Sequence, residues 1–129
     1  MKADSGARDI RERTYEYARR AVRLFRAVAE RRDEATLIIG RQYLRAATSI
    51  GANMEEAQSA ESRADFVHKC AIAQKEVREA LYWLRLLRDT SSLPQAVLDP
   101  LCDETEQLVK VITAILVKTK KGASAGPVS

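Results

Sequence analysis

The sequence predicts an all-α fold, an antiparallel up-down-up-down four-helix bundle, from three observations. Apolar residues recur at alternating spacings of three and four along four long blocks, which is the period of amphipathic helices. Only 3 of the 129 residues are proline and 5 are glycine, so few positions interrupt a helix. The blocks are joined by short connections, which favour antiparallel neighbours. A chain of this length forms one core, so we expect one domain at 1–121 and a disordered tail of small residues at 122–129.

The first helix is expected from about Ser5 to Arg32, with Asp4 or Ser5 as its cap. Its predicted core stripe is Ile10, Thr14, Tyr17, Ala21, Leu24 and Val28. The second helix is expected to begin at Glu34 behind the cap residue Asp33 and to run through Ala57. Within it, Gly51 is expected to bend the helix or loosen one turn.

The third helix is expected from about Glu61 to Asp89, with a core stripe at Phe66, Cys70, Ala73, Val77, Ala80, Leu84 and Leu87. After a turn from Thr90 to Pro94, the fourth helix carries Leu98, Leu101, Thr105, Leu108, Ile112 and Ile115. Cys70 and Cys102 both fall on apolar helical positions. We therefore expect two buried free thiols rather than a disulfide.

A second apolar stripe on the third helix consists of Ile72, Trp83 and Leu86. It lies roughly 100° to 160° from the core direction, so a bundle standing alone would expose it to water. The stripe could close onto a neighbouring helix of the same subunit. We favour an interface between subunits, with Trp83 as its anchor, because large aromatic side chains often dominate well-packed interfaces.

The second helix also carries a polar stripe. Its members, in steps of four, four and three residues, are Arg45, Ser49, Asn53 and Glu56, and nearby chain contributes Arg63 and Glu79. We expect a hydrogen-bonded structural network in which arginines pair with the glutamates; a ligand or nucleic-acid contact is the alternative.

The sequence gives no sign of catalytic chemistry. No obvious nucleophile has an adjacent base, so no catalytic residue is predicted. A di-metal carboxylate site in a four-helix bundle needs two Glu-x-x-His motifs, whereas this chain has one histidine, His68, three residues after Asp65. We therefore expect no metal site, no cofactor and no enzymatic activity.

The segment from Arg45 to Phe66 resembles the bacterial four-helix-bundle family of intervening-sequence proteins, some of which are encoded within insertions in large-subunit ribosomal RNA genes. The resemblance is carried by Arg45, Ala46, Ala47, Ser49, Ile50, Gly51, Asn53, Met54, Glu56 and Ala57, followed by Ser62, Asp65 and Phe66. The chain departs from the usual pattern at Met54, Glu55 and Ala57. The resemblance implies a homo-oligomeric ring, most often a pentamer. Similar accessory proteins of diversity-generating retroelements bind nucleic acid and a reverse transcriptase, which is an analogy of fold.

Charge gives the remaining indication of function. The formal net charge is +4 and the pI is about 9.3. Two outward faces are basic: Arg8, Arg19, Arg23 and Arg26 on the first helix, and Lys75, Arg78 and Arg85, with Tyr82, on the third. Guanidinium groups pair with phosphate and stack on bases. The sequence therefore predicts a nucleic-acid-binding accessory module for RNA, a ribonucleoprotein or DNA; the alternative is a scaffold that recruits another polypeptide, such as a reverse transcriptase. With no membrane-spanning run and no signal peptide, we expect a cytoplasmic protein.

Overall fold

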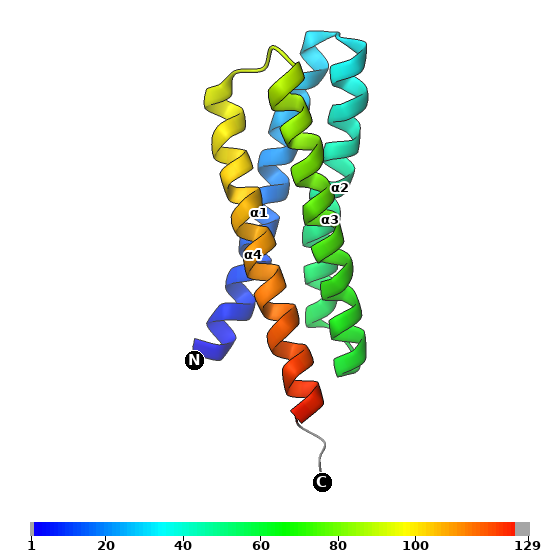
Figure 1. Cartoon of the computed structure of the whole chain (residues 1–129), viewed down its shortest axis with the longest axis vertical. Helices are drawn as coiled ribbons and strands as arrows, with labels where there is room; N and C mark the ends of the chain where they lie inside the picture. Colours follow the sequence, from blue (N-terminus) through cyan, green and yellow to red (C-terminus); the bar gives the residue numbers. More distant parts are fainter. Residues whose placement is uncertain (1, 126–129) are drawn as a thin grey trace.

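The computed structural model of the chain describes residues 2–125, with side chains described for residues 10–122. Four helices account for almost all of these residues: α1 (Lys2–Arg31), α2 (Glu34–Gln58), α3 (Arg63–Thr90) and α4 (Gln95–Ala125). The described residues contain no strand. The prediction of an all-α fold with four helices is therefore confirmed (Figure 1). None of the described helices combines the length and hydropathy needed to cross a lipid bilayer.

The helix ends differ from the predictions at several points. α1 begins at Lys2 and passes through Asp4 and Ser5, the residues expected to cap it. Aspartate and serine each cost a helix no more than about 0.7 kcal/mol relative to alanine, so they can also lie inside one. α3 begins two residues later than predicted, where the Ser62 side chain accepts a hydrogen bond from the backbone N–H of Asp65. α4 continues from Gly122 to Ala125, so the predicted tail begins too early; residues 126–129 lie outside the described part of the chain.

The break between α1 and α2 is as predicted. Arg32 has a positive φ of 57°, a left-handed conformation in which the chain leaves the helix. The Asp33 carboxylate then accepts a hydrogen bond from the backbone N–H of Thr36 at 3.0 Å, which confirms Asp33 as the N-cap of α2. The Thr36 hydroxyl donates to the same carboxylate, and this hydrogen bond, followed by that from the backbone N–H, lowers the pKa of Asp33.

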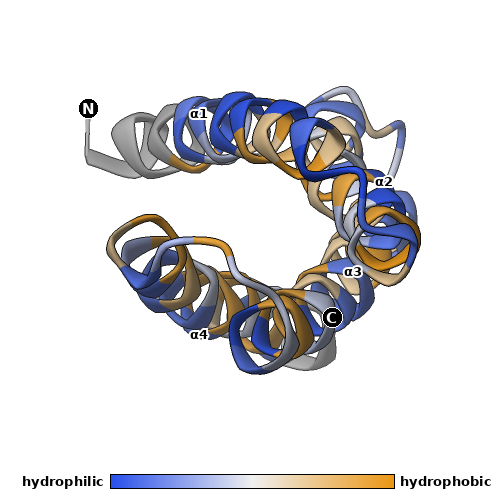
Figure 2. Ribbon diagram, turned by 90° about the horizontal axis from the view of Figure 1, so that it is seen from above, coloured by the Kyte–Doolittle hydropathy of each residue, from blue (hydrophilic) through white to orange (hydrophobic). Residues whose placement is uncertain are grey.

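Each helix packs against its neighbours in the chain. Figure 2 shows the helices end-on as a curved row in chain order, and α1 and α4, at its two ends, contact each other least among the adjacent pairs. The predicted α1 core stripe is completely buried, as are the predicted α3 residues from Cys70 to Leu87. Phe66 and Ile115 are only half-buried against this core, and Leu116 is buried beside Ile115. Cys70 and Cys102 are buried free thiols, as predicted.

Two glycines allow α1 and α2 to approach closely. A Cβ at Gly51 would lie 3.2 Å from the carbonyl oxygen of Thr14, and a Cβ at Gly40 would lie 2.8 Å from Cγ1 of Val28. α2 continues through Gly51 without interruption. The prediction that the helix passes through Gly51 is confirmed, and the missing side chain makes room for the α1 backbone.

A chain of buried hydroxyl groups connects α2, α1 and α4. Tyr43 donates to the Tyr17 hydroxyl oxygen at 2.9 Å. Thr105 donates to the carbonyl of Leu101 at 2.7 Å, so its oxygen is free to accept the hydrogen bond from Tyr17. Tyr17, Tyr43 and Thr105 are each at most 1% exposed, and every hydroxyl in this relay has a partner. The relay therefore avoids the cost of burying an unpaired polar group.

Beside the relay, Arg13 and Glu104 form a half-buried ion pair between α1 and α4. The guanidinium donates from Nε and Nη2 to the two carboxylate oxygens at 2.7 and 2.9 Å, which is the strong bidentate geometry. The relay and this ion pair join α1 and α4, which have the least backbone contact of the neighbouring helices.

The position of each hydroxyl in the relay predicts a ranking of two substitutions. Tyr17→Phe removes the middle hydroxyl, leaving the Tyr43 donor buried and unpaired, and should lower the free energy of unfolding by about 1–3 kcal/mol. Tyr43→Phe removes only the terminal donor, since Tyr17 can still donate to Thr105, and should cost about 1 kcal/mol. Urea unfolding of both variants measures the difference; equal losses would contradict the relay.

Candidate interaction surfaces

The predicted polar residues of α2 lie along its groove with α3, where they form separate contacts. Arg45 pairs with Glu79 and, at 3.4 Å, with Glu76. Trp83 donates from Nε1 to Glu79 at 3.0 Å. The hydrogen bond from Trp83, followed by that from Arg45, lowers the pKa of Glu79, and the hydrogen bond to Glu79 raises the pKa of Arg45. The indole and guanidinium groups thus fix this carboxylate in its charged form.

The other predicted members of the network are not joined to Arg45. Asn53 donates from Nδ2 to the carbonyl and the hydroxyl of Ser49, at 2.9 and 3.1 Å, within α2. Glu56 pairs with Lys69 at 2.7 Å, and its side chain is 59% exposed. Arg63 is exposed and joins none of these contacts. The predicted single network, with Glu56 paired to an arginine, is therefore wrong: water reaches this surface, and the partner of Glu56 is a lysine.

The second apolar stripe borders the same groove. Trp83 is half-buried and packs against the core, while Ile72 and Leu86 are half-buried outside the core cluster. Arg45 pairs with Glu79, and further along α2 Glu56 pairs with Lys69, which comes earlier in α3. The two helices therefore run in opposite directions. This register places Trp83 and Leu86 level with Ile38, whose side chain is 51% exposed.

The polar stripe of α2 and the second apolar stripe of α3 were predicted as separate features, but they lie on one surface, which we call the α2–α3 surface. Its residues are Ile38, Arg45, Ser49, Asn53 and Glu56 of α2, and Lys69, Ile72, Glu76, Glu79, Trp83 and Leu86 of α3. Sequence reasoning missed Glu76, Lys69 and Ile38. Glu76 and Glu79 follow Ile72 by four and seven residues, so the sequence could have shown that they lie beside the apolar stripe. Their partner, Arg45, is evident only from the way α2 and α3 pack together.

The α1 basic face, Arg19, Arg23 and Arg26, is partly neutralised within its own helix. Glu16 pairs with Arg19 at 3.2 Å and with Arg23 at 3.8 Å. Arg26 is exposed. The fourth predicted member, Arg8, lies outside the described side chains. Two of the three described arginines on this face therefore already have a carboxylate partner.

The α3 basic face, Lys75, Arg78, Tyr82 and Arg85, differs in this respect. Among the described residues, its three cationic side chains form no ion pair, and all are exposed. Tyr82 is 58% exposed and contacts Trp83 edge-on, with ring centroids 5.0 Å apart and an angle of 75°. α1 and α3 do not contact each other, so the two basic faces belong to different sides of the molecule.

Neighbouring α4 residues give the α3 basic face a charge gradient. Gln74 donates to the Thr113 hydroxyl at 3.0 Å, and from this register we infer that Lys110 lies near the level of Arg78. Asp99 lies near Arg88, and Asp99, Asp103 and Glu106 lie near Cys102, toward the end of α3 that carries Arg85. The Lys75 and Arg78 end is therefore the more positive.

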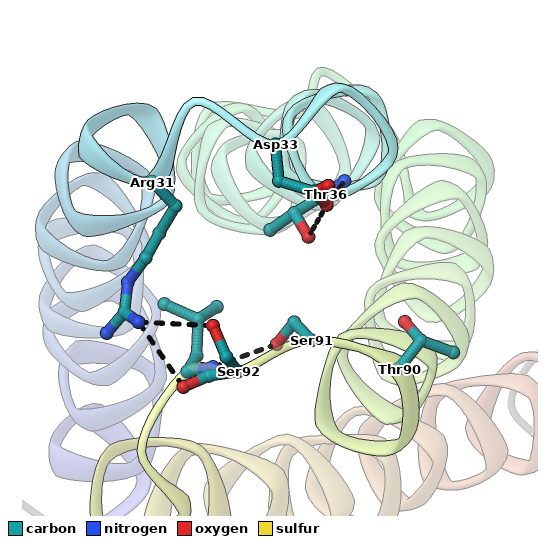
Figure 3. A pocket seen from close by; sticks show the side chains of 7 residues that line it. Arg31, Asp33, Thr36, Thr90, Ser91 and Ser92 are labelled. Carbon is teal, nitrogen blue, oxygen red and sulfur yellow. Dashed lines mark hydrogen bonds between the residues drawn. The ribbon is translucent and has the colours of Figure 1, made fainter.

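A polar cavity of about 300 Å³ lies at the end of the molecule where the α1–α2 and α3–α4 turns meet (Figure 3). Arg31 donates to the carbonyl and hydroxyl oxygens of Ser92 at 3.4 and 3.2 Å, and Asp33 is engaged by Thr36. The charged groups of the cavity thus already bind other residues of the chain. Among the described residues, no three His, Cys, Asp or Glu side chains are grouped to hold a metal ion.

The fold and these surfaces define a small helical protein whose distinctive residues lie on outer helix faces. Comparison with known proteins identifies the family: the model of the 23S rRNA-intervening sequence protein family matches residues 9–114. The chain belongs to this family. It is similar to a crystal structure of a protein of unknown function from the S23 ribosomal protein family of Bacteroides thetaiotaomicron, at 34% identity and a TM-score of 0.78, covering 86% of this chain and 97% of that one. No curated protein matches the sequence.

The exposure of Glu56 predicts that its removal has little effect on folding. Glu56→Ala should leave the free energy of unfolding nearly unchanged, because exposed ion pairs contribute little. Leu84→Ala, a deletion in the core where Leu84 is 0% exposed, should lower it by about 2–5 kcal/mol. Urea unfolding compares the two; a Glu56→Ala loss as large as that of Leu84→Ala would restore the buried-network interpretation.

Proposed function

We propose that this chain is a non-enzymatic nucleic-acid-binding module for RNA or a ribonucleoprotein, built as an up-down-up-down bundle that assembles into a homo-oligomeric ring. The observation that carries the proposal is the α3 basic face, where Lys75, Arg78 and Arg85 are exposed without ion pairs among the described residues. Structural charges on helices usually pair at the i+3 or i+4 spacing. Lys75 interacts electrostatically with Glu79, four residues further along α3, but the ion pair of Glu79 is with Arg45. The three cations are therefore available to phosphates.

The net charge of +4 supports the same proposal. Neutralising phosphates releases condensed counterions, so such binding weakens steeply as salt rises. The names of the relatives are consistent with a ribosomal RNA context: the family is called 23S rRNA-intervening sequence protein, and the similar structure is assigned to the S23 ribosomal protein family. Neither name states what those proteins bind.

The proposed assembly rests on the α2–α3 surface and on the family resemblance, which favours a pentamer. Ile72, Trp83 and Leu86 are half-buried, and Ile38 is 51% exposed at the same level. Trp83 is fixed by its hydrogen bond to Glu79, so burying it in an interface orders little additional side chain. A ring would repeat the α3 basic face, and linked weak contacts gain avidity.

The same surface also supports a second candidate function, a scaffold that recruits another polypeptide, such as a reverse transcriptase. An apolar strip bordered by Arg45, Glu76 and Glu79 has the mixed character of protein interfaces. In that case the partner, rather than a second copy of the chain, would cover Trp83.

We predict that charge reversal on the α3 basic face abolishes most nucleic-acid binding. The double variant Lys75→Glu with Arg78→Glu should bind structured RNA at least tenfold more weakly at low salt. Its plot of log affinity against log salt should be shallower by about 1.4 to 1.8, because two phosphate contacts are lost. Fluorescence anisotropy at several salt concentrations measures both quantities.

The matched control is Arg23→Glu with Arg26→Glu, which changes the net charge equally on the α1 basic face. It should retain most of the affinity. If this control loses the affinity instead, the binding face is α1. If wild-type protein binds neither RNA nor DNA even at low salt, the proposed function is wrong and the basic faces serve solubility.

For the assembly, Trp83→Ala should dissociate the oligomer and leave each subunit helical, because it removes the largest side chain of the α2–α3 surface. Light scattering with circular dichroism measures mass and helicity together. Tyr15→Ala is the control, since Tyr15 is a 68% exposed aromatic on α1. A fully assembled Trp83→Ala variant would place the interface elsewhere; a monomeric wild type would leave the α2–α3 surface to another polypeptide.

A further inference from the structure

The exposed Tyr82 ring is not explained by charge. Phosphate contacts need cations, yet a 58% exposed phenol stands within the α3 basic face. Its spacing is regular: Arg78 precedes it by four residues and Arg85 follows it by three, so an arginine is attached to the helix about one turn, ~5.4 Å, to either side. The Tyr82 hydroxyl forms no hydrogen bond within the described part of the chain.

One side of the ring is held in place. Trp83 meets Tyr82 edge-on, with an interplanar angle of 75° and centroids 5.0 Å apart. Trp83 is itself packed against the core and bonded to Glu79. This contact limits the freedom of the Tyr82 side chain while leaving more than half of it accessible. A partly immobilised, accessible aromatic ring between two cations is the arrangement that single-strand-binding proteins use, with bases stacked on rings and phosphates held by flanking basic residues.

We propose that the α3 basic face binds unpaired nucleotides, with one base stacked on the Tyr82 ring and the adjacent phosphates held by Arg78 and Arg85. This inference rests on the proposed nucleic-acid function and specifies its substrate class. In a duplex the faces of the bases are covered by their neighbours, and only a single strand, loop or end offers a free face to the ring. Stacking tolerates any base, so the face selects strandedness rather than sequence.

The test compares a short single-stranded oligouridylate with an abasic strand of the same length and with a duplex, using fluorescence anisotropy. Tyr82→Ala should lower the affinity for oligouridylate about tenfold. It should leave the affinities for the abasic strand and the duplex unchanged, because those ligands contribute phosphates but no accessible base. Tyr82→Phe keeps the ring and should bind as wild type does. Tyr15→Ala, which removes an exposed tyrosine from α1, should also bind normally.

Four outcomes would overturn the inference. If Tyr82→Ala binds oligouridylate as well as wild type does, while Lys75→Glu with Arg78→Glu still loses affinity, the face binds nucleic acid without stacking and only the proposed function survives. If Tyr82→Ala weakens abasic and uridylate strands equally, Tyr82 shapes the face rather than contacting a base. If light scattering shows instead that Tyr82→Ala dissociates the oligomer, the Tyr82 side chain belongs to a contact between subunits. If the wild-type protein binds none of these nucleic acids, both the proposed function and the proposed stacking on Tyr82 are wrong.

Discussion

The buried hydroxyl relay from Tyr43 through Tyr17 to Thr105 is the interaction on which the rest of the structure depends. α1 and α4 lie at the two ends of the curved row of helices (Figure 2) and have little backbone contact. Large side chains must therefore fill the space between these two helices, and their buried polar groups must form hydrogen bonds with one another. The relay does both, because two tyrosine rings supply volume and each hydroxyl finds an acceptor. With the core closed in this way, the outer faces of α2 and α3 are free for interaction.

α3 has a central role because each of its sides meets a different environment. Its core stripe is completely buried from Cys70 to Leu87, and the side toward α2 presents Trp83 fixed to Glu79. The remaining side presents Lys75 and Arg78 without ion pairs among the described residues. Assembly through the α2–α3 surface and nucleic-acid binding through the α3 basic face would therefore use adjacent sides of one helix, so that rings of subunits present repeated basic faces.

Local features of the fold could be predicted from the sequence, because they depend on helical period and capping chemistry. Val77 and Leu84 are buried because they share a stripe, and Asp33 caps α2 because its carboxylate reaches the N–H of Thr36. Partners could not be predicted in the same way. Glu56 pairs with Lys69 rather than with an arginine, because tertiary register decides which side chains meet across the α2–α3 groove.

The relay itself shows the same limit. Tyr17 lies in the predicted core stripe of α1, but a hydroxyl partner 88 residues away on α4 leaves no local signal. The same is true of the bidentate contact between Arg13 and Glu104, 91 residues apart. The basic faces can be predicted from the helical period, and the i+3 spacing of Glu16 and Arg19 can be read from the sequence in the same way. The second contact of Glu16, with Arg23 seven residues further on, becomes evident only from the structure.

The most direct test of the central requirement of the relay, that the Tyr17 hydroxyl is buried in its neutral form, is the pH dependence of the free energy of unfolding, measured for wild type and Tyr17→Phe between pH 9 and 12. Burial raises the pKa of Tyr17 from 10.0 to about 12, so its stabilising contribution is complete below pH 10 and is lost as pH rises toward 12. Subtracting the variant removes the alkaline titrations that do not depend on Tyr17, such as that of Cys70, whose pKa burial raises to about 11. The titration of Tyr43 remains in the difference, because its pKa is raised by burial and by its contact with Tyr17. The difference in free energy of unfolding between the two proteins should shrink by about 2 kcal/mol over this range; a difference independent of pH would contradict the burial of Tyr17 at the centre of the relay.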